Sequence, residues 1–314
     1  MVEKSERVTE LRHYRRIVAK IVRRYFGTPA RRIIYKASGL TNFVFVVNHL
    51  DGQFVIRISP DPERIGAFKK EWWATQHVRK AGVPTPEILA VGNDVGPEPY
   101  MITRRVSGAE ATHHQKRSRI IHEMGHFASI INSIQTNGFG TNFDWTDEAP
   151  KIEMWSEYLD REYQLQSRLE FFATHQILPE QELNKLSAII EETRTADIKP
   201  ALNHSDLRLK NVIVDDNGDI TAIIDWEDCL SAAAPEWELS IALHDLSIDE
   251  KQVFIEGYGL TPDKVEQMAP LIKAFNILNY QSAIASAIEQ DDQGKLGEMK
   301  LRLNGTLDLF SLAC

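Results

Sequence analysis

The sequence predicts an α+β fold of two lobes, a small N-terminal lobe on a mixed sheet and a larger, mostly helical C-terminal lobe. The length of 314 residues is about twice the ~150 expected of one domain. Short apolar runs separated by turn residues fill the chain to about residue 103, and long helical patterns follow Gly108. We therefore predict an N-terminal lobe over residues 1–103 and a C-terminal lobe over residues 104–314.

The N-terminal lobe begins with a basic helix over residues 1–32. This segment carries ten Lys and Arg against three Glu, and its apolar residues recur at helical spacing. The pattern indicates a solvated basic face on a helix that docks on the core, and a membrane-surface or targeting role is the alternative.

Short strands and one helix complete the N-terminal lobe. The runs 43–48 and 53–58 are rich in Val, Ile and Phe and are joined by Asp51 and Gly52, which is typical of a hairpin. The remaining predicted elements are strands at 33–37, 88–91 and 100–106 and a helix from 63 to 80.

Helical patterns dominate the C-terminal lobe. We predict helices at about 113–136, 152–174 and 180–195, and again from about 235 to the end of the chain. A hairpin interrupts them, with short strands at 201–202, 212–214 and 220–224.

The composition restricts the class of protein. Hydrophobic residues make up 43% and charged residues 26%, an ordinary globular balance. No apolar run reaches the roughly 18 residues of a membrane span, and two cysteines cannot build a disulfide framework. A net charge of −9 disfavours a nucleic-acid partner. We expect a soluble, cytoplasmic protein with no membrane or nucleic-acid partner and an oligomeric state that the sequence leaves open.

One polar cluster stands among apolar strands. Residues 204–211 carry His204, Asp206 and Asn211, and Val212 to Val214 follow at once. Asp225 ends the apolar run on the other arm of the hairpin. Amide and carboxylate oxygens are ligands that Mg²⁺ prefers, so Asn211 and Asp225 are candidate metal ligands.

The string HSDLRLKN at 204–211, followed by IIDWE at 223–227, resembles the phosphotransfer motif of the aminoglycoside phosphotransferase and choline kinase family, relatives of protein kinases. The resemblance implies a protein-kinase-like two-lobe fold. It also implies that Asp206 accepts the proton of the acceptor hydroxyl, that Asn211 and Asp225 hold magnesium, and that ATP is the donor, with GTP not excluded.

The same resemblance assigns nucleotide-binding roles in the N-terminal lobe. The loop 38–42 resembles the family's nucleotide loop, and Arg57 occupies the position of the kinase phosphate-binding lysine, with Glu71 as its partner and Glu63 as the rival. Residues 101–104 would be the hinge that meets adenine. The residues implied are Ser38, Gly39, Thr41, Asn42, Arg57, Glu71, Ile102 and Arg104.

Arg208 lies two residues beyond the expected base, so it could stabilise charge on the transferring phosphoryl group. The alternative is a structural pair with Glu227 or Asp228. Further on, where the family commonly has two Asp residues, this chain has Ala234 and Glu238. We expect acids in that stretch to brace the catalytic loop.

The predicted function is ATP- and magnesium-dependent transfer of the γ-phosphoryl group to a hydroxyl of a small molecule. Residues 33–314 carry a net charge of −16, which favours an aminoglycoside-like or other cationic acceptor. Trp226, Trp237 and Tyr280 could stack on a choline-like cation, although such aromatic residues are more often core. The alternatives are an amino-alcohol, amino-acid or sugar kinase of the same fold, and a nucleotide-binding scaffold without turnover.

Overall fold

The computed structural model describes residues 2–37 and 42–308, with side chains described for 10–37 and 42–303. The chain forms two compact units. Unit 1 comprises residues 1–109 and 213–227, and unit 2 comprises residues 110–212 and 228–314. The units therefore interleave in sequence, because the segment 213–227 returns to the N-terminal unit, whereas the prediction divides the chain once, between 103 and 104.

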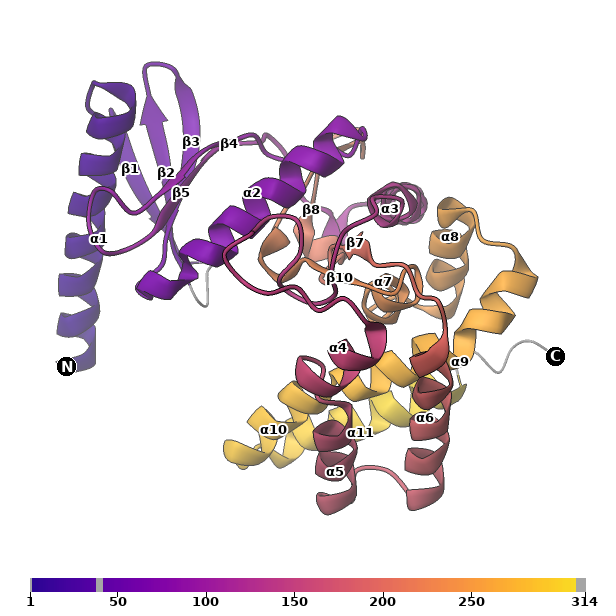
Figure 1. The fold of residues 1–314 in the computed structure, drawn as a ribbon. Helices are drawn as coiled ribbons and strands as arrows, with labels where there is room; N and C mark the ends of the chain where they lie inside the picture. Colours follow the sequence, from indigo (N-terminus) through magenta and orange to yellow (C-terminus); the bar gives the residue numbers. More distant parts are fainter. Residues whose placement is uncertain (1, 38–41, 309–314) are drawn as a thin grey trace. The chain divides into compact units, whose positions relative to one another are not determined.

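Unit 1 is built on a five-stranded antiparallel sheet in the order β1-β2-β3-β5-β4 (Figure 1). The hairpin predicted around Asp51 and Gly52 is present, with His49 opposite Gly52 in the pairing of β2 and β3. The strands are β1 Arg32–Lys36, β2 Phe43–His49, β3 Gly52–Ile58, β4 Ile88–Gly92 and β5 Tyr100–Arg104.

Helix α1 (Val2–Phe26) covers one face of this sheet. Its inner residues pack with the inward residues of β2, β3 and β5 in one apolar cluster; those of α1 are Tyr14, Ile17, Val18, Ile21 and Val22. On the outer face Arg12, Arg15, Arg16, Lys20, Arg23 and Arg24 are exposed. The predicted basic amphipathic helix is therefore confirmed over its described side chains.

The period of two along β3 sends alternate side chains to opposite faces of the sheet. Phe54, Ile56 and Ile58 are buried in the cluster beneath α1. Arg57 therefore points to the other face, where it meets α2 (Ile65–Lys80). Arg57 is thus separated from α1 by the sheet.

The segment 213–227 contributes a hairpin to unit 1. Strands β8 (Val212–Val214) and β9 (Ile220–Ile223) are neighbours in a small sheet with the two-residue strand β6 (Ala109–Glu110). The turn between them is closed by hydrogen bonds to the Asp215 side chain from the amides of Asn217 and Asp219.

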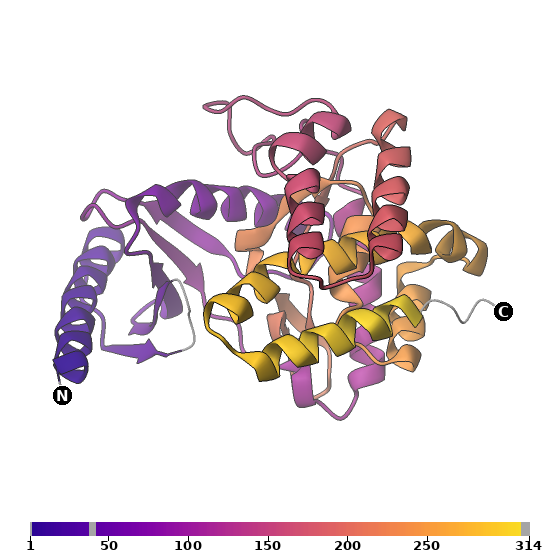
Figure 2. The ribbon, with the colours of Figure 1, turned by 90° about the horizontal axis from the view of Figure 1, so that it is seen from below.

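Unit 2 is mostly helical, around a core of aromatic and aliphatic side chains. In Figure 2 helices α5 and α6 lie side by side, next to α10 and α11. A short pair, β7 (Ala201–Asn203) with β10 (Leu230–Ala232), carries the chain into the predicted catalytic loop. The helices are α3 Arg117–Asn132, α4 Trp155–Arg161, α5 Leu165–Thr174, α6 Glu180–Glu192, α7 Glu236–Ala242, α8 Ile248–Tyr258, α9 Pro262–Asn279, α10 Gln281–Glu289 and α11 Gln293–Asp308.

The prediction of one helical stretch over 152–174 is wrong, because α4 and α5 are separate helices. Gln164 lies between them with a φ of 55°, a left-handed conformation that no helix interior contains. The sequence has no glycine or proline there to announce the break.

Helices α3 and α8 pack closely because each has a glycine where they cross. A Cβ atom on Gly257 would lie 1.9 Å from the carbonyl oxygen of His122, and one on Gly125 would lie 2.1 Å from that of Phe254. Only glycine permits this backbone approach.

No helix in the described part of the chain is both long and apolar enough to cross a membrane.

Candidate active site

The loop that follows β7 is held in shape by a buried carboxylate. Glu238, on α7, is 0% exposed and accepts hydrogen bonds from the backbone amides of His204 (2.5 Å) and Ser205 (3.4 Å). Ser205 has a φ of 64°, and its hydroxyl accepts a hydrogen bond from the indole of Trp237. The expectation that an acid of this stretch braces the loop is therefore confirmed for Glu238.

Burial raises the pKa of Glu238 to about 7, against the lowering effect of the two amide donors. Among the described residues, its Oε1 atom is buried without a hydrogen-bond partner. The brace is thus a carboxyl group that holds its proton up to near-neutral pH.

Asp206 lies at the centre of the loop and uses both of its carboxylate oxygens. Oδ1 accepts from Nε of Arg208 at 2.5 Å. Oδ2 accepts from Nδ2 of Asn211 at 2.7 Å and lies 2.9 Å from Nζ of Lys210. Asp206 is 8% exposed, so this carboxylate is fixed in orientation while one edge still reaches solvent.

The neighbours of Asp206 keep it ionised. Burial alone would raise its pKa, but the hydrogen bond from Lys210, the charges of Arg208 and Lys210 and the amide of Asn211 outweigh burial and lower it. At neutral pH the group is a carboxylate that can accept a hydrogen bond from a hydroxyl.

Among the described residues of unit 2, the partners of Arg208 are Asp206 and Asp245, so the structural pairing with Asp228 that the sequence raised is not formed. Besides Asp206, its guanidinium contacts Asp245, with Nη1 3.3 Å from Oδ2. Asp245 lies in the turn between α7 and α8, 37 residues along the chain. No sequence signal pointed to it.

In unit 1, Arg57 and Glu71 form the ion pair that the sequence predicted. Nη2 of Arg57 contacts Oε1 of Glu71, and both side chains are largely buried, at 15% and 6% exposed. The guanidinium also lies over the ring of Phe68, with its carbon 5.6 Å from the ring centre. The rival partner Glu63 instead lies in the short helical turn that precedes α2, where Asp61 caps its amide.

Asp225 and Glu227 follow β9 in the same unit. Asp225 adopts a φ of 68°, and its Oδ1 lies 3.9 Å from Nη1 of Arg57. Oε2 of Glu227 accepts hydrogen bonds from Arg64 and from Asn42, each at 3.2 Å. Burial alone would lower the pKa of the Arg57 guanidinium, but the negative charges of Glu71, Asp225 and Glu227 outweigh burial and raise it.

The other predicted nucleotide residues have mixed outcomes. Ser38, Gly39 and Thr41 lie outside the described residues. Ile102 is fully buried in β5, paired with strands on both sides, and the amide of Arg104 donates to the carbonyl of Glu87 at 2.8 Å. The adenine contacts at these two positions stay a prediction.

Each of the two predicted metal ligands, Asn211 in unit 2 and Asp225 in unit 1, offers a side-chain oxygen of the kind that magnesium prefers. Nδ2 of Asn211 donates to the carbonyl and carboxylate of Asp206, which directs its Oδ1 away from that carboxylate. The side chain of Asp225 is 41% exposed, so its oxygens are accessible. No group of three or more His, Cys, Asp or Glu forms a metal cluster within residues 2–37 and 42–308, and a magnesium site needs only one or two protein oxygens when phosphates contribute.

The aromatic residues considered for a choline-like cation belong to the core of the protein. Trp226 is 0% exposed, Trp237 5% and Tyr280 8%. Trp237 packs against Tyr163 and Phe275, and Tyr280 hydrogen-bonds to His244. They form no open aromatic cage.

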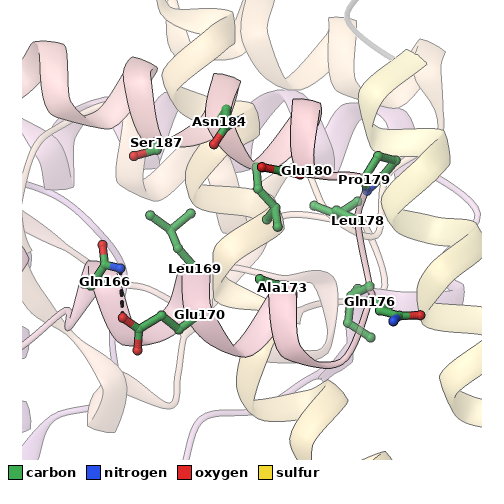
Figure 3. A pocket seen from close by; sticks show the side chains of 12 residues that line it. Gln166, Leu169, Glu170, Ala173, Gln176, Leu178, Pro179, Glu180, Asn184 and Ser187 are labelled. Atoms are coloured by element: carbon green, nitrogen blue, oxygen red, sulfur yellow. Dashed lines mark hydrogen bonds between the residues drawn. The ribbon is translucent and has the colours of Figure 1, made fainter.

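A separate groove lies between α5 and α6, with a volume of about 760 Å³ (Figure 3). Leu169, Ala173 and Leu183 supply apolar lining, and Glu170 and Glu180 are among its polar residues. None of the predicted site residues lines it, so it is not the candidate active site.

Comparison with known proteins identifies relatives of this architecture. The model of a phosphotransferase enzyme family matches residues 36–271. One similar structure is a thermostable mutant of aminoglycoside phosphotransferase APH(4)-Ia in a ternary complex with AMP-PNP and hygromycin B, 16% identical with a TM-score of 0.67, over 94% of this chain and 99% of that one. Another is APH(2")-IIIa with GDP and kanamycin, 16% identical with a TM-score of 0.65, over 94% and 98%.

A third similar structure is a putative aminoglycoside phosphotransferase from Ralstonia eutropha, 13% identical with a TM-score of 0.64, over 94% of this chain and 96% of that one. A search of curated proteins found no match. At these identities the structures establish a shared fold, which confirms the predicted protein-kinase-like class.

Proposed function

Because the chain belongs to the phosphotransferase enzyme family and is a small-molecule kinase, we propose that it transfers the γ-phosphoryl group of ATP, with magnesium, to a hydroxyl group of its acceptor. The observation that carries the proposal is the geometry of Asp206: an ionised, nearly buried carboxylate on a braced loop, with Arg208, Lys210 and Asn211 at its oxygens. A purely structural aspartate would not need two cations and an amide.

Asp206 is the proposed base. It would accept a hydrogen bond from the acceptor hydroxyl, orient the oxygen toward the phosphorus atom and hold the proton as the new bond forms. Its lowered pKa suits orientation more than strong basicity. Most of the rate gain is then expected from alignment and charge stabilisation.

Arg57 is the proposed phosphate-binding cation, fixed by Glu71 so that its remaining N–H groups are presented in one direction. Asn211 and Asp225 are the proposed ligands of magnesium, which would neutralise charge on the phosphate oxygens when bound. Asn42 is proposed to contribute to the nucleotide loop, with Ser38, Gly39 and Thr41.

Arg208 is proposed to stabilise charge on the transferring phosphoryl group. Its Nε and Nη2 atoms face Asp206, which puts the guanidinium next to the reacting hydroxyl. Its third nitrogen, Nη1, lies 3.3 Å from Oδ2 of Asp245.

For the acceptor, we propose a cationic, hydroxylated small molecule of the aminoglycoside type. Unit 1 has 19 Lys and Arg against 15 Asp and Glu, a net charge of +4. Because the whole chain has a net charge of −9, unit 2 has a net charge of −13. An acidic unit attracts a polycation. The bound kanamycin and hygromycin B of two similar structures agree with this class.

One observation favours an amino-alcohol, amino-acid or sugar acceptor instead. Two acids near the motif cannot bind a cationic acceptor freely, since Glu238 is buried beneath the loop and Glu227 is paired with Arg64. A smaller, less charged acceptor would need fewer free carboxylates.

The test is a panel assay of ADP or GDP release with magnesium and ATP or GTP. Kanamycin, hygromycin B, choline, serine and glucose serve as acceptors, with wild type and Asp206→Asn compared. We expect one acceptor class to raise release in the wild type and the variant to lose at least about 100-fold in turnover while it still binds nucleotide. Full activity of Asp206→Asn would exclude Asp206 as the base.

A further inference from the structure

Helix α3 carries the string HEMGH at residues 122–126, which neither the fold nor the proposed function explains. His122 and His126 are four residues apart, so they lie one above the other on the same face of the helix. Two histidines at this spacing on a helix, with a glutamate after the first, are the zinc-binding arrangement of metalloproteases. No other two histidines of this chain are three or four residues apart.

Both imidazole rings face solvent. His122 and His126 are exposed, whereas Met124, Gly125 and Phe127 of the same helix are buried. Among the described residues neither ring makes a hydrogen bond or an ion pair, and the ring of His126 lies near that of Phe127, with 5.7 Å between the ring centres. The ring nitrogens of both histidines are therefore available to a ligand.

The helix that presents the two rings is held at three points along its length. At its N-terminal end Arg117 pairs with Glu250 of α8. In the middle Gly125 lies against α8, where a Cβ atom would be 2.1 Å from a carbonyl oxygen. At its C-terminal end the side-chain amide of Asn132 donates to a carbonyl of β7 at 3.0 Å. A ligand that binds both rings thus has little backbone freedom to remove, which favours chelation.

The other features of a hydrolytic zinc site are missing from the part of the chain that the structure describes. No third His, Cys, Asp or Glu joins the two histidines in a metal-binding group there. Glu123, the acid of the string, is half-buried and has interactions of its own. A catalytic zinc ion needs three protein ligands besides its water. The geometry therefore supports chelation by two imidazoles without the chemistry of a protease.

The two ligands also select the kind of ion. Imidazole nitrogen suits zinc, copper and nickel, whereas magnesium takes oxygen ligands. Because Cβ atoms one turn apart are about 5–6 Å from each other, one nitrogen of each ring can lie about 2.0–2.1 Å from a single zinc ion. The remaining coordination positions of that ion are open to water.

We propose that His122 and His126 form a two-ligand site for zinc on the exposed face of α3. The inference does not depend on the proposed phosphoryl transfer, because no residue given a role there belongs to this site. Zinc that binds the native helix more tightly than the unfolded chain would raise the thermal stability of the protein as its concentration rises.

The experiment titrates zinc chloride into the full chain, without an affinity tag, by isothermal titration calorimetry. Excess magnesium chloride is present to occupy sites built from oxygen ligands. His122→Gln and His126→Gln each remove one ligand. His175→Gln is the matched control, because His175 is also exposed, lies at the end of α5 and has no histidine three or four residues away. Circular dichroism establishes that each variant is folded.

We expect one zinc ion per chain in the wild type and in His175→Gln, and an affinity at least about 10-fold weaker in each ligand variant. Zinc at ten times its Kd should raise the thermal midpoint of the wild type by about 2–4 °C. Absence of zinc binding in the wild type would overturn the inference. Equal zinc affinity in the wild type and the two ligand variants would overturn it as well, because the ion would then be held elsewhere.

Discussion

Substitutions in the ion pair between Arg57 and Glu71 can distinguish its contribution to the free energy of unfolding from its contribution to nucleotide binding. Replacing Glu71 with Leu leaves the guanidinium of Arg57 largely buried, with Asp225 at 3.9 Å as its closest remaining acid. Replacing Arg57 with Met leaves the carboxylate of Glu71, whose Oε2 already lacks a hydrogen-bond partner among the described residues. Each single change therefore leaves an uncompensated buried charge.

The expected cost follows from that burial. Breaking a buried pair costs about 3–5 kcal/mol, whereas replacing both members by apolar residues of similar volume is close to neutral. We expect about 3 kcal/mol for Glu71→Leu, since Asp225 partly compensates, and about 4 kcal/mol for Arg57→Met. The double variant should lose less than either single variant, because Phe68 and Met101 already line the site of the guanidinium.

The assay is urea denaturation followed by tryptophan fluorescence, with nucleotide affinity measured on the folded variants. A loss of 3 kcal/mol lowers the midpoint by about 1 M urea for a slope near 3 kcal/mol/M. Arg64→Met is the control, because its pair with Glu227 is partly exposed and should contribute less than about 1 kcal/mol.

The double variant also separates the two roles of Arg57. It should be folded yet bind ATP at least about 10-fold more weakly, since the proposed phosphate cation is gone. If the double variant loses the sum of the two single losses, the residues are not coupled and the buried pair does not exist in solution.

Three further outcomes are expected. Burial raises the pKa of Glu238 from the ordinary 4.5 to about 7, so its stabilising contribution is complete below about pH 4.5 and is lost as pH rises through 7. Glu238→Gln should therefore remove about 2–3 kcal/mol of the loss of stability that the wild type shows between pH 5 and 8. Urea midpoints that stay identical across this pH range in both proteins would refute this expectation. Gly257→Ala should cost about 3 kcal/mol in the same assay, because its Cβ would lie 1.9 Å from the carbonyl oxygen of His122, and a neutral result would show that α3 and α8 pack less closely. Chelation of magnesium should abolish ADP release and be reversed by added magnesium, whereas persistence in excess EDTA would exclude the metal.

The motif and its neighbours could be predicted because their relations are local. The spacing from Asp206 to Asn211 and the alternation that aims Arg57 away from α1 both follow from short stretches of chain. The pair of Arg57 and Glu71 was predicted on another basis, from the resemblance to the kinase family.

The sequence by itself determined which chemical groups the protein possesses and the order of strands and helices up to about residue 104, because propensity, turn residues and periodicity act over a few residues. Only the tertiary structure decided that Asp245 contacts Arg208, and that Trp226, Trp237 and Tyr280 are core. The physical reason is that long-range partners depend on how the helices pack and on which side chains are removed from water. The spacing of residues along the chain predicts neither the packing nor the burial.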